Sequence, residues 1–367
     1  MRALVVQSSP RELLLSTSRQ MAGRFIEGLQ SAGAEVTDID LTAVRIDDCR
    51  DCTCCMTPSV GRCVLPDEMT RRIFPLFMQT DILVLVTPVY FGMVSATLKR
   101  FIERLFPALQ ARQDVFGGTV SQPFRGPLPK TVVIASASWH VSHAFAQMSA
   151  YLHYLLGNAL TAELYRGNAS AFLFWGAFRE KRESVLQACR DAGRQMAETG
   201  AVDVETARRV SQDLGDLEKT ILSHNLSLEI GTKARISSLE LASRWLKHRE
   251  AVPPGSVQNF KNLMLLMFRG AGEGRDFTVK FTFVGDAPGV CVFHVRGKEL
   301  EITEDLESRA DLSVRTTLTQ WMQVFGKSEE SFLKAMTQGQ LLVQGNLSVL
   351  PLFSEVFVYG NTAARPG

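Results

Sequence analysis

The first two hundred residues alternate between short strand-like segments and longer segments with helical periodicity. The candidate strands are rich in β-branched residues, and the run at 81–88 lacks polar alternation, as is typical of a parallel strand covered on both faces. They lie at 2–8, 34–41, 81–88, 130–136 and 160–167. Amphipathic segments follow them at 16–33, 67–80, 94–109, 142–157 and 180–200. Five such repeats predict an α/β fold with a doubly wound, parallel five-stranded sheet.

The pattern changes in the second half of the chain. Residues 203–250 have a helical pattern and end at the Pro/Gly break AVPPGS, residues 251–256. Beyond it, 276–284 and 289–297 alternate with period two around the turn GDAPG, which predicts a β-hairpin. Further short strands and helices follow up to residue 357. We therefore predict an α/β domain at 1–200, a helical connector at 201–255 and a smaller α+β domain at 256–367.

Composition and charge exclude several classes of partner. The 367 residues are 46% hydrophobic and 21% charged, with a net charge of +2, which gives no electrostatic case for a nucleic-acid partner. The longest uncharged run, 82–98, contains Pro88 and Gly92 and is shorter than the roughly 20 residues of a membrane span. No basic segment with a cleavable apolar stretch opens the chain. We therefore expect a cytoplasmic protein with reduced thiols and no membrane span.

The segment after the first strand, SSPRELLLSTSR, has the composition of an anion site. A doubly wound fold places a helix N-terminus here, and the segment adds the Arg11 guanidinium and four hydroxyls, those of Ser9, Ser16, Thr17 and Ser18. Together these groups suit one phosphate. The segment lacks the G-x-G-x-x-G motif, which favours a mononucleotide over a dinucleotide. Capping of the helix is the alternative role for Ser16 or Thr17.

The segment after the third strand suits a planar ring system. Pro88 and Gly92 shape a loop at the carboxyl edge of the sheet, where Tyr90 and Phe91 offer flat apolar faces. Packing against a neighbouring helix is the alternative role for either aromatic side chain.

Four motifs, in this order, resemble the flavodoxin-like NAD(P)H-dependent FMN reductases and the related iron-sulfur flavoproteins. They are SSPR, C-x-x-C-x-x-C followed by G-x-C, DEM, and PVYFG with S-x-x-LKRFIER after it. The resemblance covers about residues 1–200. Two departures are Ser8, where the family usually has Gly, and the LLL at 13–15. They concern the detailed geometry of the phosphate loop.

The resemblance implies FMN as cofactor, NAD(P)H as co-substrate and an assembly of at least two copies. It implies no catalytic side chain, because the flavin carries the hydride chemistry. The implied FMN-binding residues are Ser9, Arg11, Ser16, Thr17 and Ser18 at the phosphate, Pro88, Val89, Tyr90, Phe91 and Gly92 along the isoalloxazine, and Ser136, Ser138 and Trp139 at its other edge. For His140 and His143 we expect a polar contact or a helix cap rather than a direct role.

Five of the seven cysteines lie between residues 49 and 63. The spacing C-x2-C-x2-C-x7-C suits four ligands of a [4Fe–4S] cluster, namely Cys49, Cys52, Cys55 and Cys63. Zinc, thiol redox chemistry and a metal-free loop are the alternatives, and reductases of this kind without a cluster share a similar cysteine stretch. A cluster does not need Cys54, and three nearby aspartates add negative charge, at Asp47, Asp48 and Asp51. We therefore expect FMN with substoichiometric iron, and flavin binding that largely survives Cys52→Ser.

The C-terminal part, about 256–360, resembles the sterol carrier protein fold. The resemblance is carried by ADLSVRTTLTQWMQVFGKSEESFLKAMTQGQLLVQGNLSVLPLF. It implies an apolar tunnel for a lipid or acyl chain, with seven candidate lining residues: Trp321, Met322, Phe325, Phe332, Met336, Leu350 and Phe353. Ordinary core packing is the alternative role for each of them.

These observations favour an FMN-dependent NAD(P)H oxidoreductase that acts on a small molecule, apolar or quinone-like, which the C-terminal domain presents or sequesters. The first alternative is an iron-sulfur flavoprotein that transfers electrons from a protein donor. The second is a lipid-binding or scaffolding protein whose flavodoxin-like half is inactive.

Overall fold

A computed structural model describes residues 1–116, 118–139, 142–174, 176–248, 250–272, 274–305, 307–325, 327 and 329–357. The chain divides into two compact units, the first made of 1–169 and 183–213, the second of 170–182 and 214–367. The domain boundaries predicted after residues 200 and 255 remain predictions, because compactness alone does not show which parts fold independently.

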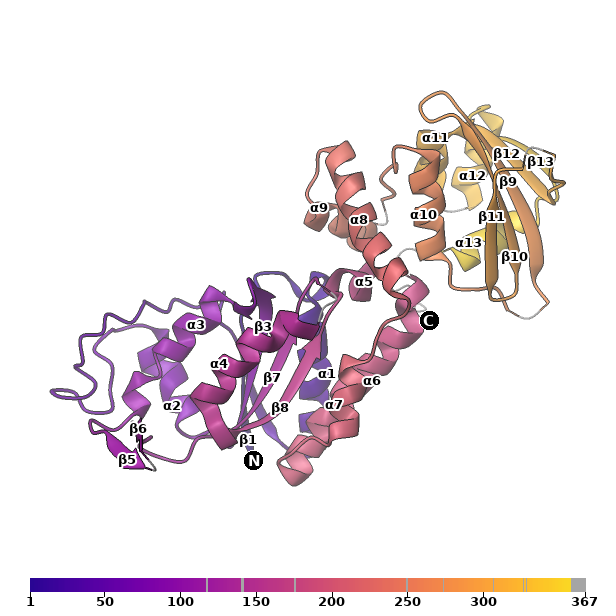
Figure 1. Ribbon diagram of the computed structural model, residues 1–367. Helices are drawn as coiled ribbons and strands as arrows, with labels where there is room; N and C mark the ends of the chain where they lie inside the picture. Colours follow the sequence, from indigo (N-terminus) through magenta and orange to yellow (C-terminus); the bar gives the residue numbers. More distant parts are fainter. Residues whose placement is uncertain are drawn as a thin grey trace. The chain divides into compact units, whose positions relative to one another are not determined.

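The first unit is built on a parallel sheet of five strands in the order β2-β1-β3-β7-β8 (Figure 1). The strands are β1 (Arg2–Gln7), β2 (Glu35–Asp40), β3 (Ile82–Tyr90), β7 (Lys130–Ser136) and β8 (Leu160–Arg166). This confirms the predicted flavodoxin-like fold class, since the order 2-1-3-4-5 is that of flavodoxin. A short strand, β4 (Met93–Val94), pairs antiparallel with β3. A separate hairpin, β5 (Asp114–Phe116) and β6 (Thr119–Ser121), was not predicted.

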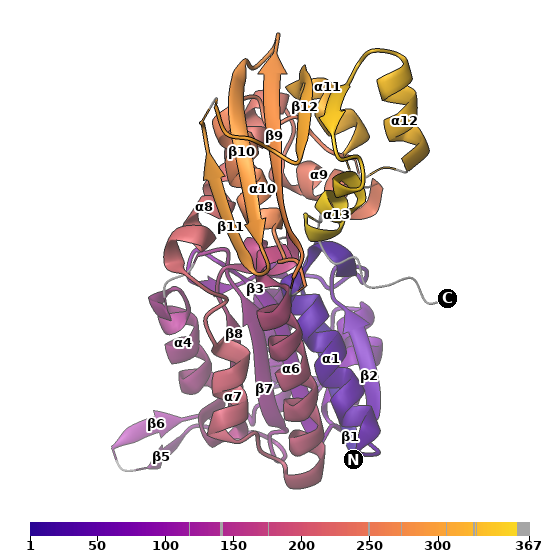
Figure 2. The same ribbon diagram turned by 90° about the vertical axis from the view of Figure 1, so that its right-hand side faces the viewer.

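Helices cover both faces of this sheet. On one face lie α2 (Phe74–Phe77), α3 (Ala96–Glu103) and α4 (Ala146–Leu156), whose apolar side chains share a core with those of β1, β3 and β7. On the other face, α1 (Thr17–Ser31) and α6 (Arg179–Thr199) lie side by side (Figure 2). A shorter helix, α7 (Val204–Ser211), follows α6, whereas α5 (Ala169–Phe174), after β8, belongs to the second unit except for its first residue. The double coverage explains why the central strands are almost entirely apolar.

Two predicted helices differ in detail from those observed. The helix predicted over 94–109 ends at Glu103, and a 3-10 turn that contains Pro107 follows at Phe106–Ala108. The helix predicted over 67–80 is a π-helical turn, Met69–Ile73, continued by α2. Proline explains the first difference, because it cannot donate a hydrogen bond inside a helix.

The contact between α1 and α6 depends on two glycines. A Cβ atom on Gly28 would lie 2.0 Å from the Arg190 carbonyl oxygen, and one on Gly193 would lie 2.0 Å from that of Phe25. No side chain fits at either position, so the two backbones approach each other directly. This approach sets the position of α1, whose N-terminus faces the predicted phosphate site.

The second unit is an α+β structure with a sheet in the order β11-β10-β9-β12-β13. Strands β9 and β12 are parallel and the other neighbours antiparallel. The strands are β9 (Asp276–Val284), β10 (Gly289–Arg296), β11 (Glu299–Thr303), β12 (Leu312–Thr317) and β13 (Leu342–Gly345). The helices are α8 (Leu217–Ala234), α9 (Ser238–Ser243), α10 (Val257–Met267), α11 (Leu318–Val324), α12 (Glu329–Thr337) and α13 (Val349–Val356).

One face of this second sheet carries an aromatic core. Phe281 of β9 contacts Phe260 of α10, Trp321 of α11 and Phe353 of α13, at ring centroid distances of 5.6, 4.5 and 5.5 Å. The side chains of β9 alternate between buried and half-buried, so the helices pack on a single face. The predicted α+β class is therefore confirmed, whereas α10 was not predicted.

None of the helices in the described part of the chain combines the length and apolarity that a membrane crossing requires. The uncharged run 82–98 forms β3, a tight turn, β4 and the start of α3.

Candidate cofactor site and cysteine cavity

The loop after β1 is anchored to the neighbouring strand through Ser8. Its backbone N–H and its hydroxyl both donate to the Val86 carbonyl, at 2.9 and 3.0 Å. The hydroxyl of Ser95, which caps α3 by accepting from the Leu98 N–H, donates to the Ser8 hydroxyl at 2.8 Å. Ser8 is buried, so the side chain that departs from the family's usual glycine joins two loops at the carboxyl edge of the sheet.

Ser16 has two roles at the start of α1. Its hydroxyl accepts from the Arg19 N–H as the helix N-cap and donates to the Ser9 hydroxyl at 2.9 Å. The Ser18 hydroxyl lies 3.3 Å away, and Thr17 donates to the Ala169 carbonyl. All four hydroxyl-bearing residues are buried. The first N–H groups of a helix have no partner within the helix and attract anions, so the predicted hydroxyls gather at a helix end suited to a phosphate.

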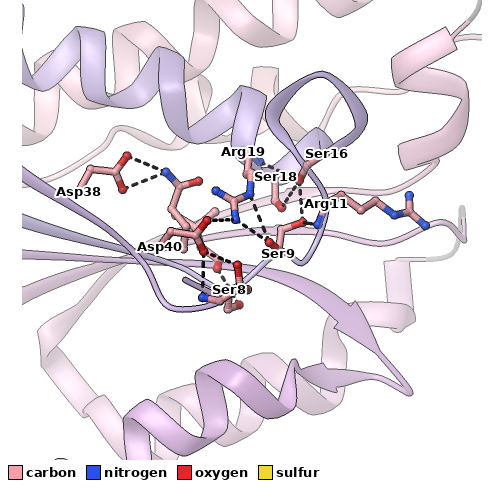
Figure 3. A network of polar contacts seen from close by, with 11 residues as sticks. Ser8, Ser9, Arg11, Ser16, Ser18, Arg19, Asp38 and Asp40 are labelled. Carbon is pink, nitrogen blue, oxygen red and sulfur yellow. Dashed lines mark hydrogen bonds and ion pairs between the residues drawn. The ribbon is translucent and has the colours of Figure 1, made fainter. Parts of the chain in front are cut away.

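Arg19, which the sequence analysis did not single out, holds this loop in place. Its guanidinium donates to the Ser9 carbonyl at 2.7 Å and to an Asp40 carboxylate oxygen at 2.6 Å. Burial opposes ionisation of Asp40, but hydrogen bonds from Thr42 and Arg19 outweigh it, so the pKa of Asp40 lies below its ordinary value. Arg11 is exposed, and Figure 3 shows its side chain extending away from the serines. The arginine that orders the loop is therefore Arg19.

The predicted ring-binding loop is the tight turn between β3 and β4. Phe91 and Gly92 have φ angles of 49° and 77°, the positive values of a two-residue type I′ hairpin turn. This conformation is unfavourable for phenylalanine. The Phe91 side chain is nevertheless fully exposed at 107%, and Tyr90 is 46% exposed. A strained backbone that holds an aromatic ring in solvent favours a binding role over core packing.

Ten of the thirteen predicted FMN-binding residues line one polar pocket of about 40 Å³ at the carboxyl edge of the sheet. They are Ser9, Arg11, Ser16, Thr17, Ser18, Pro88, Val89, Tyr90, Ser136 and Ser138. Leu15 and Ala169, which were not predicted, also line it. Phe91, Gly92 and Trp139 lie outside the pocket lining. The enclosed volume suits a group the size of a few water molecules, such as a phosphate, rather than a ring.

The residues present fit FMN in chemistry. Hydroxyls and a helix N-terminus converge where a phosphate would be held, and beyond them Phe91 and Trp139 offer aromatic faces that are 107% and 71% exposed. His140 lies outside the described residues, and His143 is exposed in the turn before α4. The roles assigned to the thirteen residues remain predictions.

The cysteine segment forms a second cavity of about 180 Å³. All four predicted cluster ligands line it, whereas Cys54 does not; the lining cysteines are Cys49, Cys52, Cys55 and Cys63. Within the described ranges, no three His, Cys, Asp or Glu side chains are arranged to hold one metal ion. A single zinc ion needs closely converging ligands, whereas a four-iron cluster is a larger body with one thiolate per iron. The ligand role of these four cysteines remains a prediction.

Arg104 is the buried cation of this cavity. Its guanidinium, 1% exposed, donates to both carboxylate oxygens of Asp67, at 2.5 and 3.1 Å. It also donates to the Asp47 carbonyl at 2.7 Å and to the Cys63 Sγ at 3.3 Å. Burial opposes ionisation of Asp67, but hydrogen bonds led by that from Arg104 outweigh it and keep the pKa of Asp67 below its ordinary value. The guanidinium thus contacts one of the four sulfur atoms while its charge is paired with Asp67.

The expectation of little iron rested partly on the negative charge of three aspartates near the cysteines. The carboxylates of Asp47 and Asp48 are paired with Arg45 and Arg100, at 3.0 and 2.6 Å. Only Asp51, exposed in an irregular segment and with a φ of 48°, has no such pairing among the described residues. The charge next to an anionic cluster is therefore largely compensated. The expectation itself stays a prediction.

In the second unit, most of the predicted lining residues are core residues. Trp321, Met322, Phe325 and Phe353 are each 1% exposed, and Phe332 is 8% exposed. The Trp321 Nε1 is buried without a hydrogen-bond partner in the described part of the chain. Met336 and Leu350 are half-buried. The interior is thus filled by packed rings, and an apolar ligand here stays a proposal.

The first unit has a flavodoxin-like fold with a small polar pocket at the carboxyl edge of its sheet. The family model for NADPH-dependent FMN reductase matches residues 1–160, which confirms the predicted resemblance for that region.

A curated iron-sulfur flavoprotein of Archaeoglobus fulgidus is 30% identical over 107 residues, which are 29% of this chain and 46% of that protein. The chain thus spans less than half the length of this relative. Among solved structures, an NAD(P)H:quinone oxidoreductase from Methanothermobacter marburgensis is 20% identical, with a TM-score of 0.40, over 53% of this chain and 96% of its own. The ubiquinone synthesis protein UbiJ-SCP2 is 14% identical, with a TM-score of 0.20, over 22% and 64%. These structural scores support no argument about activity.

Proposed function

We propose that the chain is an FMN-dependent NAD(P)H oxidoreductase. The observation that carries this proposal is the polar pocket at the carboxyl edge of the parallel sheet, within the region that the FMN reductase model matches. Ligands of open α/β sheets bind at this edge, and the pocket is lined by the N-terminus of α1 together with the loops after β3 and β7.

In this proposal the side chains position the cofactor and do not react. The hydroxyls of Ser9, Ser16 and Ser18 and the N-terminus of α1 hold the phosphate, and Arg19 keeps their loop in place. Tyr90 and Phe91 provide apolar faces for the ring. FMN held there would supply the hydride and electron chemistry. The proposal also includes a small apolar or quinone-like electron acceptor. It further includes a lipid or apolar ligand in the second unit and an assembly of at least two copies of the chain.

Ser18→Ala tests the proposal because it removes one pocket hydroxyl and leaves the N-cap Ser16 intact. Ser31→Ala, at the other end of α1, is the matched control, since that hydroxyl donates to the Gly28 carbonyl outside the pocket. A hydrogen bond to a charged group contributes about 1.5–3 kcal/mol, so Ser18→Ala should weaken FMN binding at least about tenfold. Quenching of FMN fluorescence measures the dissociation constant. Equal affinity of Ser18→Ala, Thr17→Ala and the wild type would place the phosphate elsewhere.

A second candidate function is electron transfer by an iron-sulfur flavoprotein. The observation that favours it is that Cys49, Cys52, Cys55 and Cys63 line one cavity and Cys54 does not. Protein purified without oxygen should then contain about four iron and four sulfide per chain, from the composition of one cluster. Cys52→Ser should lose them and the control Cys54→Ser should keep them. Iron below one per chain in the wild type, or equal loss in both variants, would remove this candidate.

A further inference from the structure

The first unit contains another cavity, of about 210 Å³, at the opposite edge of the sheet from the polar pocket. Its floor includes Leu83 and Thr131, near the beginnings of β3 and β7, whereas the polar pocket is lined by Tyr90 and Ser136 at the ends of these strands. Phe77, at the end of α2, completes this part of the floor and is 4% exposed. The cavity is therefore separate from the predicted cofactor site.

The walls of the cavity are apolar and only half covered. Leu105, Phe124, Leu128 and Leu155 line it from α4 and from the segment that carries the β5–β6 hairpin. All four are half-buried side chains packed against the core. Apolar surface gains free energy when it leaves water, roughly in proportion to the area covered. A hollow with such walls and few polar groups is the usual form of a small-molecule site.

The polar groups of the cavity carry no net charge. Lys99 and Glu103, one turn apart on α3, form an ion pair with a Nζ–Oε1 distance of 2.5 Å. The Thr131 hydroxyl donates to the Pro129 carbonyl, and Lys99 lies 6.0 Å from the centre of the Tyr151 ring. A charged ligand would have to break the ion pair, so the lining favours a neutral one.

The hydroxyl of Tyr151 remains available for a ligand. No hydrogen bond engages it within the described part of the chain, and its ring forms part of the cavity lining. Burial raises the pKa of Tyr151, so that the hydroxyl stays protonated at neutral pH and can donate. Its complement is an oxygen atom on the ligand.

We propose that this cavity binds a small neutral aromatic molecule of one or two rings that carries a hydroxyl or carbonyl oxygen. The volume exceeds the roughly 150 Å³ of an apolar cavity that accepts benzene and lies below the roughly 300 Å³ of drug-sized sites. Glu103 and Phe106 line both this cavity and the cysteine cavity, so the ligand lies beside the cysteine segment. This inference goes beyond the proposed function and does not depend on FMN or nicotinamide.

Calorimetric titration of the full chain with 1-naphthol, without nicotinamide, tests the proposal. We expect one site per chain, at least tenfold weaker binding in Leu155→Trp, where the added ring fills the cavity, and unchanged binding in Tyr154→Trp. The control is matched because Tyr154 is the neighbouring residue of α4 and is 90% exposed. Tyr151→Phe should weaken 1-naphthol severalfold while naphthalene binds it as well as it binds the wild type.

Leu128→Trp fills the cavity from another wall and serves as a second variant in case Leu155→Trp does not fold. Thermal unfolding of both variants identifies a folding defect. Equal binding by the wild type and both tryptophan variants would overturn the proposal, as would competition between 1-naphthol and FMN. So would an absence of binding together with a smaller assembly of Leu155→Trp, because a second copy of the chain would then cover the cavity.

Discussion

At the scale of single residues, one hydroxyl after β1 combines helix capping and pocket lining, two roles that the sequence offered as alternatives. The sequence offers helix capping and pocket lining for Ser16, and the structure shows both, since its hydroxyl accepts from Arg19 and also lines the pocket. Arg11, two residues after Ser9, was the cation predicted for the phosphate. Arg19 lies ten residues after Ser9, and its hydrogen bond to the Ser9 carbonyl forms only because the loop folds back onto α1. The sequence alone does not indicate this contact.

Substitution of Arg11 tests the predicted phosphate site. Because the side chain lines the pocket but is exposed, Arg11→Ala should weaken FMN binding by about 1.5 kcal/mol, the lower end of a charge-assisted hydrogen bond. Arg24→Ala removes an equally exposed arginine of α1 that pairs with Glu27 and should change nothing. Fluorescence titration compares the two variants. A dissociation constant unaltered by Arg11→Ala would remove that side chain from the site.

The ion pair of Arg104 and Asp67 predicts a pH-dependent stability. Folding lowers the pKa of Asp67, so its carboxylate stabilises the fold above the ordinary pKa of 3.8, and this is lost as the pH falls through the folded-state value. Asp67→Asn should cost about 3 kcal/mol at pH 7 because it leaves a buried arginine without its partner. The difference from the wild type should shrink near pH 3.

Urea unfolding at both pH values measures this difference. Asp48→Asn, which breaks the exposed pair with Arg100, should cost less than about 1 kcal/mol at either pH. A cost of Asp67→Asn that does not depend on pH would show that the carboxylate charge is not what stabilises the segment.

At the scale of elements, continuous apolar runs predicted the parallel strands well, because burial on both faces leaves little room for polar residues. The end of α3 and the hairpin β5–β6 were missed: the first depends on Pro107, and the second has short strands around two glycines. For α10 a signal was present, since Ser256 caps it and Phe260, Leu263, Met264 and Met267 recur at helical spacing.

Substitution of Phe91 in the turn between β3 and β4 should change the stability of the fold and the affinity for FMN in opposite directions. Phe91→Gly should raise the stability by up to about 1 kcal/mol, because glycine adopts a positive φ without strain, yet it should weaken FMN binding through loss of an aromatic face. Thermal unfolding and FMN titration of one preparation give both quantities. Wild-type affinity and an unchanged flavin spectrum in Phe91→Gly and Tyr90→Ala would show that this turn does not touch the flavin.

The packing of α1 on α6 can be tested with two glycine substitutions, one at the contact and one away from it. Gly193→Ala should destabilise the chain by about 2 kcal/mol or more, because the new Cβ would overlap the Phe25 carbonyl. Gly23→Ala, in α1 with nothing within 4 Å of its Cβ position, should stabilise it by about 0.5–1 kcal/mol through helix propensity. Urea unfolding compares the two. A neutral Gly193→Ala would mean that the helices lie farther apart than described.

At the scale of the whole molecule, the sequence placed the cysteines and the aspartates in one segment but could not show what compensates their charge. Only folding brings Arg100 of α3 to Asp48 and Arg104, directly after α3, to Cys63, across 52 and 41 residues of the chain. The residues that line the apolar cavity beside the cysteines are also far apart in the sequence, so no local motif indicates this cavity. The first unit was predictable in its fold class and in most pocket residues, whereas its charge pairing was not.

The proposed function requires that FMN bound to this chain exchanges electrons with a nicotinamide. The most direct measurement is a titration of the FMN-loaded full chain with NADH and with NADPH in the absence of oxygen, followed through the visible flavin absorption. We expect one FMN per chain and loss of that absorption after about one equivalent of at least one of the two nicotinamides, because a hydride carries two electrons. Tightly bound FMN that neither nicotinamide reduces, although dithionite does, would contradict it and leave electron transfer from a protein donor as the function.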